Sequence, residues 1–293
     1  MEEKVREKYL EAGKIAKKAK KKAVSMVKPG NNFEKVAEAA EKVIRDEGAE
    51  TAFPVNISIN EQAAHYTPEK QDKKTFSKGD LVKIDVGAQI DGYIGDTAET
   101  VDLGNHEKLV KAAVEAVESN LEIASDGTEL GNLGEKAENA IKERGFKPVK
   151  NLGGHSLEQY NLHAGTMLPC IKTTSANNLE KGKAYAVECF ATNGEGKVLE
   201  GGAGNIYKYE GGSTRDRTAR KIIKLVKSKY RGLPFTTRWI NQSKARTKLA
   251  MGQMVRKGVM KEYGVLKEQS GGQVSQHEHT IIVTEEGAEI TTK

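Results

Sequence analysis

The sequence predicts a fold of the α+β class, with helices packed on an antiparallel or mixed sheet. Two helical segments come first, strand-like segments follow, and a second pair of helices precedes the next strands. Because strand and helix do not alternate regularly, a doubly wound parallel sheet is the less favoured architecture. The length of 293 residues allows one large domain or two modest ones.

Two helices are expected at the start of the chain. From Glu3 to Val27, apolar residues recur at spacings of three or four, as on one face of a helix. The segment Lys28-Pro29-Gly30 then ends the periodicity. Asn32 can cap a second amphipathic helix, which we expect to end at Gly48.

Strand-like segments follow from Ala52. Residues 53–60 alternate apolar and polar side chains for much of their length, as a half-buried strand does. Residues 81–88 and 93–101 are further apolar segments, and the dipeptide Asp91-Gly92 between them is typical of a two-residue hairpin turn. These two segments are therefore predicted to pair as antiparallel strands.

A second set of helices and strands follows. Residues 106–124 and 133–144 have helical periodicity, and residues 184–192 and 279–283 are strand-like. The order of elements suggests that the chain consists of two similar halves.

Residues 215–263 differ from the rest because they are basic and helical in pattern. We interpret them as a small helical insertion between two strands, packed on the core because no low-complexity linker bounds them. The predicted organisation is one main domain, residues 1–195 and 267–293, with an insertion subdomain of residues 196–266.

The chain carries 47 Lys and Arg against 41 Asp and Glu, a formal net charge of +6. Part of the excess lies in one cluster of the first helix, which consists of Lys17, Lys18, Lys20, Lys21 and Lys22. Such a cluster can attract a phosphate backbone, but we favour its interpretation as a solvated helix face. A weak attraction to ribosomal RNA is compatible with both.

The two cysteines, Cys170 and Cys189, occur without a C-x-x-C motif. This pattern supports neither a disulfide framework nor a thiolate zinc site, and we interpret Cys189 as a buried structural thiol. No segment approaches the roughly 20 apolar residues of a membrane span, and the N-terminus lacks the apolar run of a signal peptide. We therefore expect a cytoplasmic protein with no membrane contact.

Five polar residues stand out in largely apolar or glycine-rich surroundings: Asp85, Asp96, His155, Glu188 and Glu278. Each alone has an ordinary interpretation, as a solvent-facing strand residue or a loop histidine. Together they are harder to explain, because strands disfavour carboxylates and unpaired buried carboxylates repel one another. The predicted hairpin would also bring Asp85 and Asp96 close together.

Two divalent cations would cancel the charges of four such carboxylates. Oxygen-rich ligation with one imidazole suits Mn, Fe, Co or Zn. Two metals about 3.5–4 Å apart can hold a bridging hydroxide and polarise a carbonyl, which makes hydrolysis the expected chemistry.

Four more histidines need an interpretation. His65 and His163 are candidates to contact a scissile amide or a tetrahedral intermediate, although a loop histidine is the ordinary interpretation of each alone. His277 and His279 flank Glu278 and are expected to point away from it, because neighbouring strand residues face opposite sides.

Several short motifs surround these residues and keep a consistent order along the chain. They are Ala52-Phe53-Pro54, Ala63-Ala64-His65-Tyr66-Thr67-Pro68, Ile84-Asp85-Val86-Gly87, Asp96-Thr97-Ala98, Gly154-His155, Leu162-His163-Ala164-Gly165, Glu188-Cys189-Phe190 and Glu278-His279-Thr280. The motifs resemble those of the methionine aminopeptidases through nearly the whole chain. The helical insertion, with Leu233-Pro234-Phe235 and Arg238-Trp239, resembles the type II subfamily, and the absence of a long N-terminal extension is similar to its archaeal members.

The resemblance implies the pita-bread fold, in which two αβ halves surround a centre with two divalent cations. It also implies that Asp85 holds one metal, that His155 and Glu188 hold the other, and that Asp96 and Glu278 bridge the two. Cys189, which follows Glu188, and His277, which precedes Glu278, differ from the residues common at these positions in relatives. Neither replaces a metal ligand.

The implied reaction is removal of the initiator methionine from nascent polypeptides when the second residue is small. A metal-bridging hydroxide would attack the first peptide bond, with His65 assisting catalysis at the scissile region and His163 contacting the peptide. Phe53, Leu162 and Tyr263 would line the methionine pocket, whose apolar character suits a thioether. We expect a monomer with a weak association with the ribosome.

Two rival interpretations stay open. A prolidase or proline aminopeptidase would share the metal ligands but carry a large N-terminal domain, whereas only two short helices precede Phe53. A non-catalytic pita-bread protein that binds the ribosome or nucleic acid would lose metal ligands, whereas all five are present. The basic insertion and the lysine cluster keep this second rival open.

Overall fold

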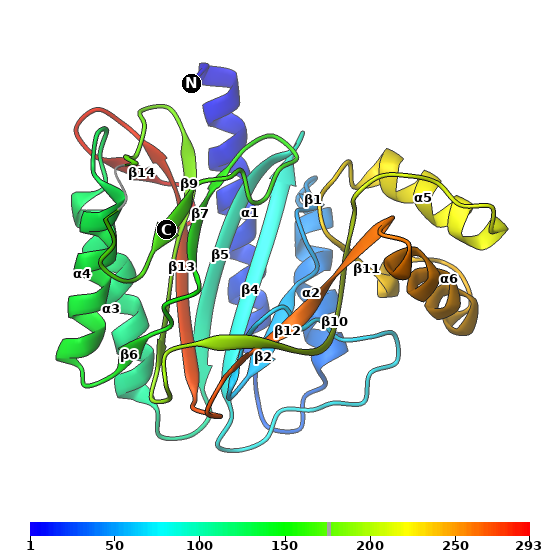
Figure 1. The fold of residues 1–293 in the computed structure, drawn as a ribbon, viewed down its shortest axis with the longest axis horizontal. Helices are drawn as coiled ribbons and strands as arrows, with labels where there is room; N and C mark the ends of the chain where they lie inside the picture. The colour runs from blue at the N-terminus through cyan, green and yellow to red at the C-terminus, as the bar shows by residue number, and fades with distance from the viewer. Residues whose placement is uncertain (175–176) are drawn as a thin grey trace.

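The computed structural model of the protein describes residues 1–174 and 177–293, and its helices flank three sheets (Figure 1). The helices are α1 (Glu3–Met26), α2 (Phe33–Asp46), α3 (Glu107–Ile123), α4 (Leu130–Glu143), α5 (Arg217–Lys229), the 3-10 helix η1 (Thr237–Trp239) and α6 (Lys244–Arg256). The strands are β1 (Glu50–Thr51), β2 (Asn56–Ile59), β3 (Gln62–Ala64), β4 (Leu81–Ile90), β5 (Tyr93–Asp102), β6 (Lys147–Pro148), β7 (Gly153–Leu157), β8 (Met167–Pro169), β9 (Ala184–Thr192), β10 (Val198–Tyr209), β11 (Phe235–Thr236), β12 (Met260–Glu268), β13 (Val274–Val283) and β14 (Ala288–Ile290).

The strands form two four-stranded sheets and one six-stranded sheet. In the first sheet, β4 pairs with β5 and with the short strands β1 and β2. The second has the order β11-β10-β12-β3, and the third has the order β14-β13-β9-β7-β8, with β6 also paired to β9. Each of these pairings is antiparallel, which confirms the sheet type predicted from the sequence.

Each half of the molecule has its own helix pair. The apolar faces of α1 and α2 pack with residues of β2 and β4 in one buried cluster. The apolar faces of α3 and α4 pack with residues of β9 and β13 in another, which lies to the left of α1 and α2 in Figure 1. The two αβ halves implied by the resemblance are therefore present.

The two halves meet where β5 lies beside β13. The backbone N–H of Asp96 donates to Thr280 Oγ1 at 2.8 Å, and Thr97 Oγ1 donates to the carbonyl oxygen of Glu278 at 2.9 Å. These hydrogen bonds cross the junction at the backbone of two of the predicted metal ligands, Asp96 and Glu278. The centre of the molecule is therefore tied together at the place where the ligands converge.

The predicted boundaries are close to the observed ones. Asn32 caps α2 by accepting a hydrogen bond from Lys35 N at 3.2 Å. Asp91 and Gly92 both have positive φ, 50° and 89°, as a type I′ hairpin turn requires. In contrast, β13 begins at Val274 rather than at residue 279, because polar side chains that serve the site interrupt its apolar pattern.

The helical insertion lies between β10 and β12, which pair with each other, and β12 also pairs with β3. The prediction that residues up to 263 are helical is wrong for residues 260–263, which begin β12. η1 anchors the insertion, since the Arg238 guanidinium donates to both carboxylate oxygens of Glu41 on α2 at 2.7 and 2.8 Å. The division into a main domain and a subdomain of residues 196–266 stays a prediction.

One lysine of the α1 cluster is not solvated. Lys20 is 5% exposed, and its Nζ donates to Thr97 Oγ1 at 2.9 Å. The prediction of a solvated helix face is therefore wrong for Lys20, which is one turn from Ala16 and shares its buried face. None of the helices in the described part of the chain combines the length and the apolarity that crossing a membrane requires.

Candidate metal centre and substrate cavity

The β4–β5 hairpin brings the first two candidate ligands together. Its register places Asp85 opposite Ala98 and Asp96 opposite Gly87, so the two aspartates are diagonal neighbours on one face of the pair. Carboxylate groups on diagonal neighbours of an antiparallel pair are close enough to bind a shared ion. The hairpin predicted from Asp91-Gly92 thus accounts for their proximity.

The other sheet supplies the remaining ligands. Glu188 on β9 is directly opposite Glu278 on β13, and His155 on β7 is opposite Ala186 on β9. A Cβ atom on Gly154 would lie 2.2 Å from the carbonyl oxygen of Ala186. Glycine is therefore needed before His155 to let β7 approach β9 closely.

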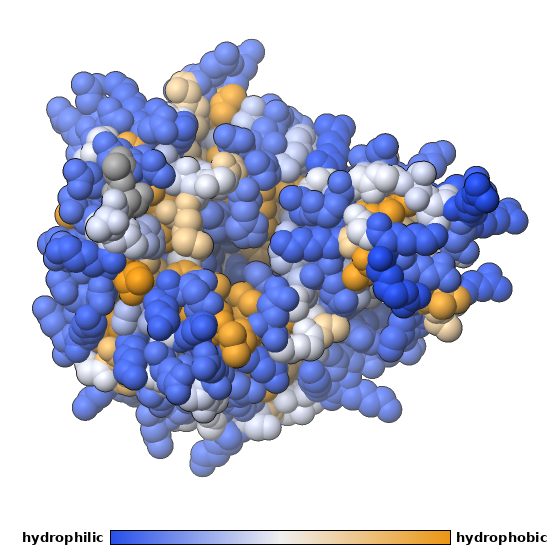
Figure 2. All heavy atoms as spheres, viewed as in Figure 1, coloured by the Kyte–Doolittle hydropathy of each residue, from blue (hydrophilic) through white to orange (hydrophobic). Residues whose placement is uncertain are grey.

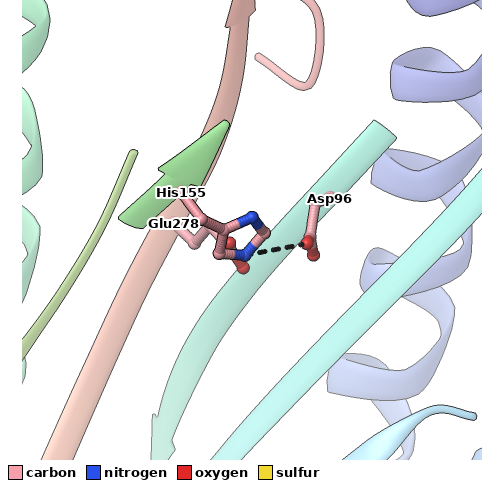
Figure 3. Close-up of side chains that lie close together, drawn as sticks. All are labelled: Asp96, His155 and Glu278. Atoms are coloured by element: carbon pink, nitrogen blue, oxygen red, sulfur yellow. Dashed lines mark ion pairs between the residues drawn. The ribbon is translucent and has the colours of Figure 1, made fainter. Parts of the chain in front are cut away.

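The five side chains form two overlapping groups of potential ligands. One group is Asp96, His155 and Glu278, and the other is Asp85, Glu188 and Glu278; the ligand atoms within each group all lie within 4.8 Å of one another. Figure 3 shows Asp96, His155 and Glu278 converging from three strands, with His155 Nε2 3.9 Å from Asp96 Oδ2.

The hydrogen bonding of these groups fits a metal centre. Within the described part of the chain, one oxygen each of Asp85 and Asp96, both carboxylate oxygens of Glu278 and Nδ1 of His155 are buried without a hydrogen-bond partner. Buried charged groups are costly unless they are paired or bound to a metal. The donor set of four carboxylates and one imidazole therefore matches the requirements of divalent cations.

The electrostatics support the same conclusion. Burial raises the pKa of Asp85 to about 7. Burial also raises the pKa of Asp96, Glu188 and Glu278 well above the ordinary value, and repulsion between the neighbouring carboxylates adds to the effect. Burial lowers the pKa of His155 to about 3, so its imidazole is neutral. Cations would keep the carboxylates ionised by supplying the missing positive charge.

A cavity of about 310 Å³ opens over this centre. Its lining contains all ten residues that the sequence singled out: Phe53, His65, Asp85, Asp96, His155, Leu162, His163, Glu188, Tyr263 and Glu278. These residues come from both halves of the chain and from the base of the insertion. The structure thus brings the whole candidate site together, while the role of each residue stays a prediction.

His65 is held rigidly at the edge of the cavity. Its backbone is in the left-handed region, with φ 66°, a strained conformation that is concentrated at functional sites. A Cβ atom on Gly204 would lie 2.0 Å from the carbonyl oxygen of His65, so β10 packs tightly against this turn. The ring of His65 lies edge-on to Tyr263, with centroids 5.4 Å apart.

Gln276 was missed by the sequence analysis. It is 2% exposed on β13, and its Nε2 donates to Glu188 Oε1 at 2.6 Å. Its amide also acts to lower the pKa of Asp85, against the larger effect of burial, which raises it. Gln276 is two residues before Glu278, so strand alternation puts both on one face, and this signal could have identified it.

The other unassigned groups near the centre are structural. Cys170 and Cys189 are free, buried thiols with their Sγ atoms 2.9 Å apart, as expected for Cys189. His279 hydrogen-bonds Thr292 Oγ1 at 2.8 Å, and its ring lies beside that of His277. Neither histidine lines the cavity, so the prediction that both point away from Glu278 agrees with the structure.

Comparison with known sequences identifies the family. Residues 7–285 match the family described as metallopeptidase family M24. A methionine aminopeptidase of Archaeoglobus fulgidus is 48% identical over 294 residues, which cover 100% of both chains. A methionine aminopeptidase of Pyrococcus horikoshii is 44% identical, covering 98% of this chain and 99% of the relative.

Solved structures share the fold at low sequence identity. A thermophilic Arx1 aligns with a TM-score of 0.87 at 20% identity, covering 99% of this chain and 91% of the Arx1 chain. Methionine aminopeptidase from Thermotoga maritima aligns with a TM-score of 0.74 at 22% identity, covering 100% of this chain and 98% of that chain. Prolidase from Pyrococcus furiosus aligns with a TM-score of 0.64 at 19% identity, and this chain covers only 64% of it. These likenesses concern the pita-bread fold, whereas the full-length sequence identities decide the family. The chain therefore belongs to metallopeptidase family M24 and, within it, to the methionine aminopeptidases.

Proposed function

We propose that this protein removes the initiator methionine from new proteins by hydrolysing the first peptide bond, with a preference for a small second residue. The observation that carries the proposal is the single cavity that joins five metal-ligand side chains, neutral histidines and an apolar wall. The 48% identity to a methionine aminopeptidase over the full length supports the same activity. As a member of a metallopeptidase family, the chain uses divalent metal ions.

The proposed centre holds two divalent cations per chain, from among Co, Mn, Fe and Zn. Asp85 would hold one cation, His155 and Glu188 the other, and Asp96 and Glu278 would bridge them. When bound, the cations would activate a water molecule and polarise the scissile carbonyl. The two converging groups of ligand atoms share Glu278, which supports its assignment as a bridging carboxylate.

His65 is the proposed catalytic histidine, and His163 the proposed contact to the peptide. Burial lowers the pKa of both imidazoles to about 4, so both are neutral near pH 7. A neutral imidazole can donate an N–H to charge that develops on the scissile group without adding a positive charge beside the cations. The close packing of Gly204 against the backbone of His65 would keep that donor in place.

The proposed methionine pocket is the apolar wall formed by Phe53, Leu162 and Tyr263. A polarisable thioether packs well against aromatic rings. A Cβ atom on Gly87 would lie 2.2 Å from the Phe53 ring, so glycine is required to seat that ring. The cavity volume is near the lower end of the range for ligand pockets, about 300–1,000 Å³, which supports a small second residue.

The proposed substrate also sets the proposed cellular context. Nascent chains emerge from ribosomes in the cytoplasm, so we place the protein there, in weak contact with the ribosome. All ten candidate residues belong to one chain, and a monomer is therefore sufficient to form the site.

The test is release of free methionine from Met-Ala-Ser and Met-Lys peptides by metal-loaded protein. Wild type is expected to cleave only Met-Ala-Ser. His65→Ala is expected to be slower by about 10²–10⁴-fold, the usual contribution of general acid–base groups. His106→Ala is the matched control, because His106 lies at the start of α3 and outside the cavity.

Two results would contradict the proposal. Equal cleavage of Met-Lys would remove the preference for a small second residue. Folded protein that releases no methionine with any of the four metals would instead favour a non-catalytic binding protein.

A further inference from the structure

The helical insertion has a charge that the rest of the chain does not share. Residues 215–257 contain fourteen Lys and Arg and a single acidic residue, Asp216. Subtracting them from the 47 Lys and Arg and the 41 Asp and Glu of the chain leaves 33 cations and 40 anions. The remainder therefore has a formal net charge of −7, whereas these 43 residues carry +13.

The positive charge is displayed rather than neutralised. Thirteen of the fourteen cations are exposed, and Arg238 is the buried one. Within the described part of the chain, the exposed cations form only two ion pairs, Lys229 with Glu50 at 3.8 Å and Lys244 with Glu69 at 2.9 Å. Asp216 is engaged in capping α5 through Ala219 N.

The geometry places these cations on one outward surface. α5 and α6 lie together at one end of the molecule, away from β5 and β13, where the metal centre lies (Figure 1). On the face seen in Figure 2, the most hydrophilic atoms gather at this end, beside smaller hydrophobic patches. On α5 the apolar residues Ala219, Ile222, Ile223 and Val226 are buried, so its lysines and arginines project from the opposite face.

We propose that the outer surface of α5 and α6 binds the phosphate backbone of RNA. Like charges one turn apart destabilise a helix, and a polyanion would relieve that repulsion. An extended basic surface on one element is the electrostatic footprint of nucleic-acid binding. The choice of RNA rests on the proposed function, because the nascent-chain substrate is presented by an RNA-rich particle.

The composition of the surface disfavours a membrane. Helices that lie on a bilayer bury a broad apolar face with large apolar side chains. The apolar face of α5 is already buried in the protein, and Leu249 on α6, which is 64% exposed, is the one large hydrophobic side chain of the insertion that is prominently exposed in the described structure. Phosphate contacts require only cations, which this surface supplies.

The experiment compares two charge-reversal variants that change the net charge equally. The insertion variant carries Lys221→Glu, Lys224→Glu, Arg246→Glu and Lys248→Glu, four exposed residues in no ion pair among the described residues. The control carries glutamate at four exposed lysines of α1: Lys14, Lys18, Lys21 and Lys22. Binding of a labelled RNA hairpin is measured by fluorescence anisotropy between about 50 and 200 mM KCl.

The insertion variant is expected to bind RNA at least about tenfold more weakly than wild type at 100 mM KCl. The slope of log affinity against log salt is expected to fall by about one for each phosphate contact removed. The α1 variant is expected to keep the wild-type slope. Methionine release from Met-Ala-Ser is expected to be unchanged in both, which shows that they are folded.

Three results would overturn the proposal. They are equal weakening in both variants, no RNA binding by wild type at about 50 mM KCl, and binding to phosphatidylserine vesicles in place of RNA. A wild type that releases methionine but does not bind RNA would contradict this proposal and leave the proposed function intact. A wild type that binds RNA but releases no methionine would contradict the proposed function instead.

Discussion

Gln276→Met tests whether the centre depends on a residue that binds no metal itself. The substitution keeps the length of the side chain and removes its amide donors. Gln276 donates to Glu188 at 2.6 Å, and its amide also favours the ionised form of Asp85. By the ligand assignment proposed above, these carboxylates are terminal ligands of different cations. One amide therefore orients Glu188 and acts electrostatically on Asp85, a ligand of the other metal.

The expected magnitude follows from the hydrogen bond to Glu188 and the electrostatic effect on Asp85. A hydrogen bond to a charged group contributes about 1.5–3 kcal/mol, and about 1.4 kcal/mol corresponds to a factor of ten in affinity. Partners that orient metal ligands typically contribute about 10–100-fold to metal affinity. We therefore predict that Gln276→Met weakens the binding of both cations by about 10–100-fold, and that excess metal restores most of the activity.

The assay is isothermal titration of metal into the metal-free protein, beside the matched variant Gln273→Met. Gln273 precedes β13, and its side-chain oxygen has no hydrogen-bond partner among the residues that the structure describes, so its replacement is expected to leave metal affinity unchanged. Wild-type affinities in Gln276→Met, or the same loss in both variants, would refute the reasoning.

Three further predictions concern the framework. Glu41→Gln removes the counter-charge of buried Arg238 and is expected to lower the free energy of unfolding in urea by about 3–5 kcal/mol. Asp46→Asn, which breaks an exposed ion pair on the same helix, is expected to lower it by no more than about 1 kcal/mol. Equal losses in the two variants would contradict this. Burial acts to raise the pKa of Glu268, but hydrogen bonds from Ser270 and from backbone N–H groups outweigh it and lower the pKa to about 2. The stabilisation by the Glu268 carboxylate is therefore present above the unfolded pKa of about 4.3 and is lost as pH falls toward 2. In acid unfolding curves, Glu268→Gln is expected to lack that part of the decline in stability, and curves identical to those of wild type would contradict this. Gly154→Ala would place a Cβ atom too close to the carbonyl oxygen of Ala186. We expect the free energy of unfolding in urea to fall by about 1–3 kcal/mol and metal binding to weaken. Wild-type values of both quantities would contradict this, because they would show that β7 can shift to accommodate the methyl group.

Much of the centre could be predicted from the sequence because its signals are local. The Asp91-Gly92 turn determines the pairing of β4 with β5 and so the approach of Asp85 and Asp96. Carboxylates within apolar strands identified Glu188 as a candidate in the same way. The antiparallel sheets and the first helix pair followed from periodicity and turn residues.

What the sequence analysis missed depends on contacts between distant segments. Lys20 and Gln276 were missed because polar residues are ordinarily solvated, although Lys20 shares the helical spacing of buried Ala16 and Ala23. The direct pairing of Glu188 with Glu278 depends on the register of β9 and β13, which are about 80 residues apart in sequence and which no local pattern determines.

The account is tested most directly by counting bound metal and measuring methionine release in the same samples. Equilibrium dialysis against Mn²⁺ or Co²⁺ is followed by assay with Met-Ala-Ser, for wild type, Asp96→Asn and the exposed control Asp46→Asn. We predict that activity in wild type and Asp46→Asn rises as bound metal approaches two ions per chain, and that Asp96→Asn binds less metal and loses activity. Full activity in metal-free protein, or unchanged metal content and activity in Asp96→Asn, would contradict the account.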